Sequence, residues 1–420
     1  MRISLIDYGT FCDFKITYSI AKRLLIQGHT VVYITSVSNK LSSPDFNAAI
    51  KSGKLVVHQY DITQYIDISN SEELNKGVTI YKYLDPKSYR LAFYIHNTLK
   101  PVLKKVLIGV DYTLMHFPSL LFASAIPEGI PTGVFFVAPG YPNTSLPWVL
   151  SNEIQEKDFL KVNKKYTSTE TIYNTMSLLA LSPTFYREFF SKSDLFAMWE
   201  KMILPLPDSI FKVKQIGSIC DTLVEKFPPT PEVVKRFLDS KKLDLKLVYF
   251  STGSFKIGEK IIFIIEVMLK KGFSILLHGS VSDTVEKALI NKNFENLFLF
   301  NSFVSHEFLI PKVDLVVTSG SLCMTAIANK AGKPLFYIPI LNEQYLWAKL
   351  YLKNTGQKYI DKFCSGPVIR KTVNVMIKGL YTNKKLELFT KKLQKTTKTK
   401  DPIISLVGFV LASAAKNTQV

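Results

Sequence analysis

The chain has 420 residues, of which 47% are hydrophobic, 12% aromatic and 21% charged. This composition excludes a disordered protein, and the length predicts two domains of roughly 200 residues each. The formal net charge of +19 is compatible with nucleic acid or an anionic membrane as a partner. Only six of the 53 basic residues are Arg, which argues against nucleic-acid recognition and leaves peripheral membrane association open.

The cysteines and the two chain ends bear on the compartment. The four cysteines are widely spaced and form no CxxC pair, so we expect a reducing, cytoplasmic location and no zinc site. The sequence begins directly with a strand pattern, which predicts no secretory signal. The apolar run at 403–415 is too short to span a bilayer and predicts a helix that docks onto the folded body.

The first 140 residues alternate β-branched runs with amphipathic stretches. Residues 2–7 predict a strand, 15–27 a helix that stops at Gly28, and 30–35 the next strand. Further strands are expected at 54–60, 112–117 and 132–138, with a helical segment over 86–107. Apolar strands that alternate with helices predict a parallel sheet covered on both faces.

The same alternation returns near residue 245. Strands are expected at 245–252, 273–279, 296–301, 313–319 and 334–339, with a helix over 260–272. The Pro-rich stretch at 204–234 predicts a linker between the halves. We therefore expect an α/β protein of two doubly wound, Rossmann-like lobes around a cleft, in which ligands bind at the carboxyl ends of the strands.

The predicted domain boundaries follow from this alternation. They are an amino-terminal domain over 1–205, a linker over 206–240, a carboxyl-terminal domain over 241–395 and a final helix over 396–420 that packs back on the first domain.

The chemistry-bearing segment of the second half is 303–356. A strand ends at Thr318, a turn of small residues follows, and a helix then runs to Gly332. Backbone N–H groups at such a helix start, together with the helix dipole, suit a diphosphate. The sequence contains no GxGxxG, GxxxxGK[ST] or DxD motif, which argues against dinucleotide dehydrogenases, P-loop NTPases and metal-clamped nucleotide-sugar enzymes.

The segment 303–356 resembles the donor-binding region of GT-B glycosyltransferases, in the branch of sterol glucosyltransferases and glycopeptide-antibiotic glycosyltransferases. The matching features include the pair Glu343-Gln344 after Pro339 and, nearer residue 250, the pair Gly253-Ser254. By this resemblance, the donor-binding residues are Gly253, Ser254, Val304, His306, Ser319, Gly320, Ser321, Cys323, Met324, Glu343 and Gln344.

The first loop of the chain resembles the GTRGD loop of the same family, with Gly9, Thr10 and Asp13 in register. The resemblance implies that Asp13 is the general base that takes the proton from the acceptor hydroxyl. At a helix start the dipole favours an ionised carboxylate. The segment 129–148 resembles the family's acceptor segment, so the implied acceptor-binding residues are Thr10, Phe11, Phe136, Tyr141 and Trp148.

The resemblance implies an inverting, metal-independent hexosyltransferase, in which the domain over 1–205 binds the acceptor and the domain over 241–395 binds the nucleotide sugar. Its donor would be a UDP- or TDP-sugar that serves as co-substrate, with no cofactor and no metal, and its acceptor a lipophilic small molecule such as a sterol, polyketide or glycolipid. Monomer and homodimer both stay open. Ser319 replaces the family's diphosphate-contacting His, and Glu343 replaces an Asp. Loss of a charge-assisted hydrogen bond to phosphate would cost about 1.5–3 kcal/mol.

These departures leave alternatives open. The chain could be a weakened enzyme or a non-enzymatic nucleotide-sugar-binding protein of the same fold, and a GT-B epimerase is a third reading. Asp13 could instead cap the helix that we expect over 15–27, and Glu343-Gln344 could lie in a solvated loop. His29, at the helix end, is interpreted as a structural residue. His306 is interpreted either as structural or as a contact to the nucleotide, and Trp347 as a packing residue.

Overall fold

The computed structural model describes most of the chain. Of residues 11–15, 44, 95–96, 183–187, 233, 342–343 and 417 it describes the backbone alone. The described residues are 1–7, 11–35, 44–60, 95–116, 122–137, 183–206, 209, 211–219, 232–239, 245–251, 258–279, 281–301, 304–340, 342–361, 364–399 and 401–417.

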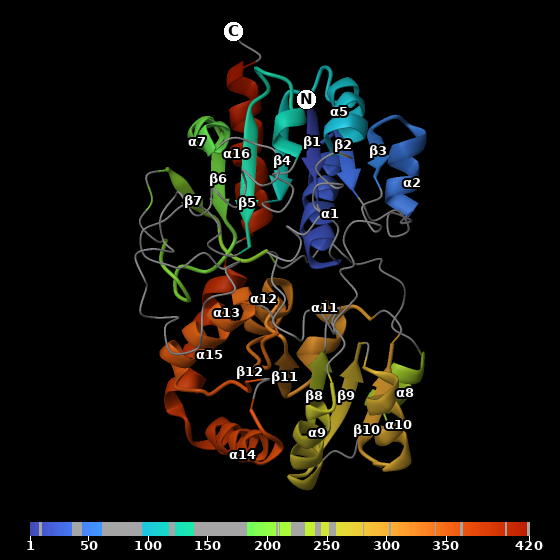
Figure 1. The fold of residues 1–420 in the computed structure, drawn as a ribbon, viewed down its shortest axis with the longest axis vertical. Coiled ribbons are helices and arrows are strands. Elements are labelled where there is room, and N and C mark those ends of the chain that lie inside the picture. The colour runs from blue at the N-terminus through green and yellow to red at the C-terminus, as the bar shows by residue number, and fades with distance from the viewer. Residues whose placement is uncertain are drawn as a thin grey trace. The chain divides into compact units, whose positions relative to one another are not determined.

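The chain divides into two compact units. The amino-terminal unit contains the described residues up to Ile219 and the last helix of the chain, and the carboxyl-terminal unit contains the described residues from 232 to 399. Each unit is built around one parallel sheet (Figure 1). The two similar α/β halves that the sequence predicts are therefore present.

The sheet of the amino-terminal unit has seven strands in the order β3-β2-β1-β4-β5-β6-β7, all paired in parallel. Five of these strands were expected, and each lies within one or two residues of its predicted range. The strands are β1 (Arg2–Ile6), β2 (Thr30–Thr35), β3 (Leu55–Gln59), β4 (Tyr112–His116), β5 (Thr132–Phe136), β6 (Asp194–Ala197) and β7 (Val213–Gln215).

The last two strands correct the predicted linker. Strand β7 lies inside the stretch 206–240 that the prolines indicated as a linker, yet it pairs with β6 through Leu195–Val213 and two further residue pairs. The amino-terminal unit thus continues past residue 205. Strands of three and four residues are too short to produce a readable alternation, which is why the sequence pattern did not reveal them.

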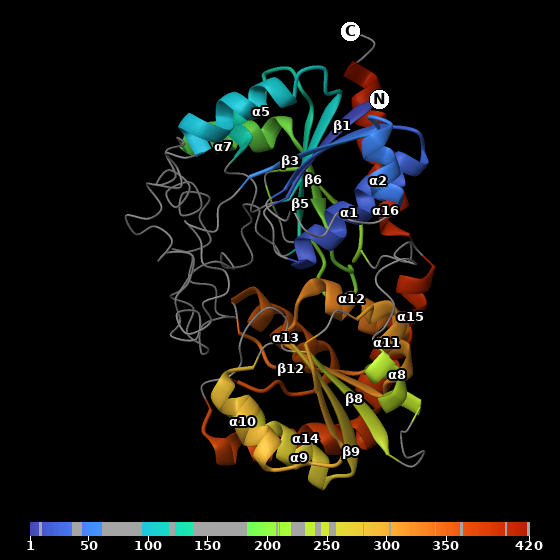
Figure 2. The ribbon, with the colours of Figure 1, turned by 90° about the vertical axis from the view of Figure 1, so that its right-hand side faces the viewer.

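Helices cover both faces of this sheet (Figure 2). Helices α1 (Phe11–Ile26), α2 (Pro44–Lys51) and α16 (Pro402–Asn417) lie on one face, and α5 (Lys100–Val106), preceded by a π-helical turn at Ile95–Leu99, and α7 (Pro183–Lys192) lie on the other. The carboxyl-terminal helix α16 packs against α1. Arg23 bonds Asp401 at 3.0 Å, and the hydroxyl of Ser413 donates to Asp194 at 2.7 Å, so both ends of α16 are tied to this unit.

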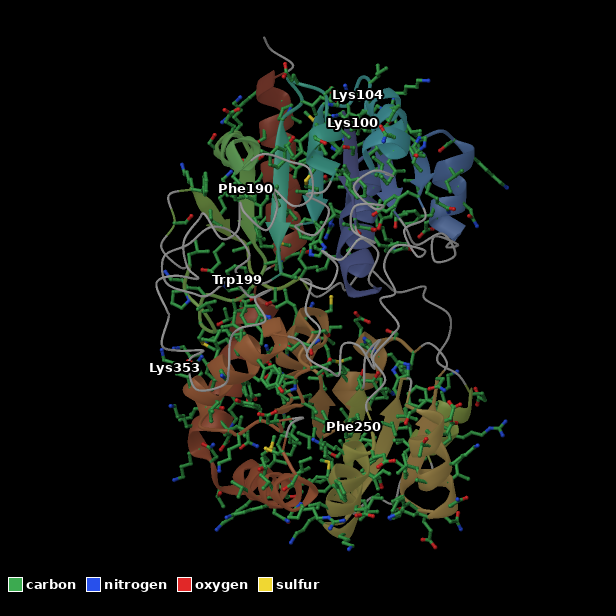
Figure 3. All side chains as sticks on the ribbon, viewed as in Figure 1. Lys100, Lys104, Phe190, Trp199, Phe250 and Lys353 are labelled. Atoms are coloured by element: carbon green, nitrogen blue, oxygen red, sulfur yellow. The ribbon has the colours of Figure 1, made fainter. Side chains whose placement is uncertain are left out.

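The sheet of the carboxyl-terminal unit has five parallel strands in the order β10-β9-β8-β11-β12. Side chains of alternate positions, such as Val248 and Phe250, enter a core formed with helices α9 (Lys260–Lys270) and α14 (Gly366–Thr382) (Figure 3). The strands are β8 (Lys246–Ser251), β9 (Phe273–His278), β10 (Leu297–Phe300), β11 (Leu315–Thr318) and β12 (Leu335–Tyr337).

The helices of this unit also form two layers (Figure 2). Helices α9 (Lys260–Lys270), α10 (Asp283–Asn291) and α14 (Gly366–Thr382) cover one face of the sheet. The other face carries α11 (His306–Leu309), α12 (Leu322–Ala331) and α15 (Lys384–Lys398). Helices α8 (Glu232–Asp239) and α13 (Asn342–Thr355) flank these three. Among the described helices, none has both the length and the apolar character that crossing a bilayer requires.

Strand order identifies where each unit can hold a ligand. In the amino-terminal sheet, successive strands are added on one side of β1 up to β3 and then on its other side from β4 onward. In the carboxyl-terminal sheet the same change of side occurs between β8 and β11. Ligands of doubly wound sheets bind outside the carboxyl ends of the strands at such switch points. Asp7 and His116 mark this edge in the first unit, and Ser251 and Thr318 mark it in the second.

Candidate functional site

The turn that follows β11 forms the most specific feature of the carboxyl-terminal unit. Gly320 has φ of 99°, and its N–H donates to the Thr318 hydroxyl at 3.2 Å. Ser321 adopts extended backbone at the N-cap of α12, and its side chain makes no capping hydrogen bond. The first N–H groups of a helix have no partner within the helix. The turn therefore presents backbone donors at the switch point of the sheet.

Helix α12 is held rigidly behind this turn. All eight residues from Leu322 to Asn329 are buried, which includes the side chains of Cys323 and Met324. The helix ends at Gly332, as the sequence predicts, and Gly332 has the left-handed conformation with φ of 69°. Because the side chains of residues 323 and 324 point into the interior, only their backbone N–H groups are suited to a ligand.

Gln344 lies beside the same turn. A Cβ placed on Gly320 would lie 2.9 Å from Tyr337 Cδ1 and 3.5 Å from Gln344 Cβ. Gln344 is 2% exposed, and its Oε1 accepts the N–H of Ile340 at 2.8 Å. The structure thus brings together Gly320 and Gln344, both of which the resemblance implies to be donor-binding residues. Glu343 lies in the first turn of α13, and its side chain is outside the described residues.

We expect Gly320→Ala to lower the free energy of unfolding by about 1–3 kcal/mol, because a side chain at this φ is strained and would press on Tyr337. Chemical denaturation of the purified protein measures the change. Gly408→Ala, in α16, is the matched control because a Cβ there meets nothing within 4 Å. A Gly320→Ala protein as stable as this control would contradict the tight packing of the turn.

His306 belongs to a cluster of polar rings next to the strand ends. It is the first residue of α11, and its ring centroid lies 5.8 Å from that of Tyr249 and 6.0 Å from that of His278. The Tyr249 hydroxyl and His278 Nδ1 are 2.5 Å apart, and burial raises the pKa of Tyr249. Tyr249 and His278 were missed in the sequence. The sequence feature that could have pointed to this cluster is a histidine, His278, at the end of an otherwise largely apolar strand.

A cavity of about 170 Å³ lies next to this cluster. Phe300 separates the two, because its ring stacks on His278 at 4.6 Å and also lines the cavity. The polar lining comes from Glu286 and Asn301. Val304, which the resemblance places near the nucleotide, is 1% exposed and packs in the interior.

Asp13 lies in the first turn of α1, which begins at Phe11 instead of residue 15. This earlier start contradicts the reading of Asp13 as the N-cap, because an N-cap precedes the helix. The helix dipole at this position favours a carboxylate. The side chains of Phe11 and Asp13 are outside the described residues, as are the whole residues Thr10, Tyr141, Trp148, Gly253 and Ser254.

Asp7, at the carboxyl end of β1, forms a buried polar network that the sequence analysis missed. Its carboxylate accepts hydrogen bonds from Thr17 at 2.9 Å, Tyr33 at 2.5 Å and Thr35 at 2.8 Å. The Tyr60 hydroxyl also donates to the Asp7 carbonyl. Because Thr17 belongs to α1, the network fixes that helix on the sheet. The available signal was a single acid at the end of an apolar strand.

Several other residues singled out in the sequence have structural roles, because they are buried or close the end of a helix. Phe136 is fully buried on β5, 6.2 Å from the ring of Phe190. Trp347 is 4% exposed, as the packing reading requires. The N–H of His29 donates to the Leu24 carbonyl at 3.0 Å and so closes the end of α1. His116, at the end of β4, was not singled out in the sequence. Burial lowers its pKa to about 3, so this histidine is neutral at ordinary pH.

No family model matches the chain. In sequence it is similar to a sterol 3-beta-glucosyltransferase of Eremothecium gossypii, with 24% identity over 201 residues that cover 44% of this chain and 15% of that protein. It is also similar to a sterol 3-beta-glucosyltransferase of Arabidopsis thaliana, with 24% identity over 252 residues that cover 54% of this chain and 38% of that protein. The matches thus span less than half of each relative.

Solved structures match nearly the whole length of the chain. Medicago truncatula UGT71G1 complexed with UDP-glucose superposes with a TM-score of 0.70 at 13% identity and 98% coverage of both chains. The calicheamicin glycosyltransferase CalG4 gives a TM-score of 0.61 at 11% identity, with 99% of this chain and 98% of that chain covered. The expected GT-B fold and the resemblance to the sterol glucosyltransferase branch are both confirmed by these comparisons.

Proposed function

We propose that this chain, which has the GT-B fold and is similar in sequence to sterol 3-beta-glucosyltransferases, is itself a glycosyltransferase. It would move a hexose or deoxyhexose from a UDP- or TDP-sugar to a hydroxyl of a lipophilic acceptor. A sterol is the first acceptor to test, because the relatives carry that substrate in their names. Another lipid or natural product is the wider class.

The observation that carries the proposal is the turn from Thr318 to Leu322. A buried glycine with positive φ, an N-cap without a side-chain bond and the start of a ten-residue helix meet at the sheet's switch point. An anionic diphosphate satisfies the backbone N–H groups there and interacts favourably with the helix dipole. Gln344, held against the same turn, would contact the sugar, with Glu343 as its neighbour.

In the proposed reaction Asp13 is the general base. Its carboxylate takes the proton of the acceptor hydroxyl, and the oxygen attacks the anomeric carbon from the face opposite the leaving group. The bond from the anomeric carbon to the donor phosphate breaks as the new glycosidic bond forms, so the configuration inverts and the nucleoside diphosphate leaves. The backbone N–H groups of residues 319–324 would stabilise the leaving charge without a metal ion.

A nucleotide-sugar screen tests the donor half of the proposal. We expect UDP- or TDP-sugars at millimolar concentration to raise the melting temperature of the purified chain, because a ligand of the folded state stabilises it by mass action. Gly320→Ala should reduce this shift and Gly408→Ala should not. The enzyme proposal fails if nucleotide sugars neither raise the melting temperature nor are slowly hydrolysed by the protein.

One observation favours a second candidate, a nucleotide-sugar-binding protein without transfer activity. Ser319 stands where the resembling family has a diphosphate-contacting His, and it is 3% exposed. A short, buried hydroxyl supplies less charge to a phosphate than an imidazolium does. Donor binding without a glycosylated product, in the presence of many acceptors, would support this second candidate. Conversion of the free nucleotide sugar into its epimer, without any acceptor, would instead show that the chain is an epimerase.

A further inference from the structure

Helix α15 has an unusual surface. It contains six lysines and one glutamate in 15 residues, and all six lysines are exposed. Its buried side consists of Leu386, Thr390, Leu393 and Thr397, spaced by three or four residues, and packs on α12. This spacing places them on one stripe of the helix. The opposite stripe, formed by Lys384, Leu388, Lys391, Lys392 and Lys395, we call the outer face.

An apolar side chain lies at the centre of the outer face. Leu388 is 67% exposed, and lysines surround it at positions three, four and seven residues away. The single acid of the helix, Glu387, is bound by Lys391 at 2.5 Å, which lowers the pKa of Glu387. Within the described part of the chain, no carboxylate pairs with Lys392, Lys395 or Lys398. The outer face is therefore both cationic and partly apolar.

The basic surface continues beyond α15. The Lys385 ammonium donates to the carbonyl of Lys353, which places a further exposed lysine at the end of α13 beside it (Figure 3). Tyr381, three residues before α15, is 59% exposed, and the ammonium of Lys246 lies 4.0 Å from its ring centroid. An amphipathic tyrosine next to lysines is typical of residues at a membrane interface.

We propose that the outer face of α15 docks onto the headgroup surface of an anionic lipid bilayer. Lysine stems extend along the surface while their ammonium groups contact lipid phosphates, and Leu388 enters the apolar boundary. The charge complementarity is with anionic lipid headgroups. A nucleic acid would not bury the central leucine, and α15 contains no Arg, the residue that reads phosphate most specifically. The proposal does not depend on sugar transfer.

Sedimentation with vesicles tests this docking on the full chain. We expect binding to phosphatidylcholine vesicles that contain about one third phosphatidylserine, no binding to phosphatidylcholine alone, and release at high salt. Lys392→Glu together with Lys395→Glu should lower the partition coefficient about 30-fold or more, because each lysine contributes to attraction near the surface. Both side chains are exposed, so the melting temperature should not change.

Two further variants separate docking from a general charge effect. Lys104→Glu with Lys105→Glu, on exposed lysines of α5 in the other unit, changes the net charge equally and should have little effect. Leu388→Ser should lower binding about tenfold while the charge stays constant, and it also serves as the test if the double variant fails to fold. Unchanged binding in the α15 variants, an equal loss in the α5 control, or binding to an RNA oligonucleotide but not to anionic vesicles would overturn the proposal.

Discussion

Asp13→Asn is expected to lower glycosyl transfer at least about 10²-fold while leaving the affinity for the nucleotide sugar unchanged. An alcohol is a poor nucleophile at neutral pH, so transfer needs a base, and an amide cannot accept the proton. The donor groups proposed to bind the diphosphate belong to the other unit of the chain, which predicts a loss in kcat with little change in donor binding. Single-turnover transfer and a donor titration measure the two quantities.

The matched control is Asp45→Asn. Asp45 also lies in the first turn of a helix of the amino-terminal unit, where its side chain is 51% exposed and lies 3.8 Å from Lys22. It shares with Asp13 the residue type and a place in the first turn of a helix. We expect this variant to transfer sugar at the normal rate. Equal activity of the Asp13 and Asp45 variants would show that the base lies elsewhere.

Asp7→Ala is expected to lower the free energy of unfolding by about 3–5 kcal/mol. The substitution removes the acceptor of three buried hydroxyl groups, those of Thr17, Tyr33 and Thr35, each of which would then be buried with one partner fewer. It also releases α1 from β1, so any remaining folded protein should lose transfer activity. Urea denaturation, followed by circular dichroism, measures the loss.

Two variants calibrate this expectation. Thr35→Val removes one donor and keeps the side-chain volume, so it should cost about 1 kcal/mol. Asp45→Ala removes an exposed carboxylate of the same unit and should change the free energy by about 0.5 kcal/mol or less. An Asp7→Ala protein that unfolds with the same midpoint as Asp45→Ala would show that the network does not hold the sheet edge.

The alternation of strands and helices was readable because both sheets are parallel and covered on both faces. Their central strands are therefore largely apolar runs, such as residues 30–35 and 246–251. Glycines with positive φ follow several of the helices between strands, namely Gly28 after α1, Gly272 after α9 and Gly332 after α12. The start of α1 was predicted four residues too late, because the periodic apolar pattern begins only after Asp13. Local pattern also could not reveal β7, whose three residues gain their stability from pairing with β6.

The candidate site was partly readable for a different reason. A small-residue turn between a strand and a helix has a fixed backbone geometry, so Gly320 and its neighbours could be placed from sequence order alone. Tyr249, His278 and His306 could not, because they come from β8, β9 and α11 and meet only through tertiary packing. Asp7 was missed because its three partners lie 10, 26 and 28 residues away along the chain.

A transfer assay with the purified full chain, UDP- and TDP-sugars and a 3-hydroxysterol tests whether the chain is a sterol glycosyltransferase, with products identified by mass spectrometry and NMR. We expect a sterol glycoside whose anomeric configuration is opposite to that of the donor, formed with the release of a nucleoside diphosphate. A product that retains the donor configuration would contradict the proposed attack with Asp13 as base. Donor binding with no transfer to this or any other lipophilic alcohol would contradict the proposal that the chain is a glycosyltransferase.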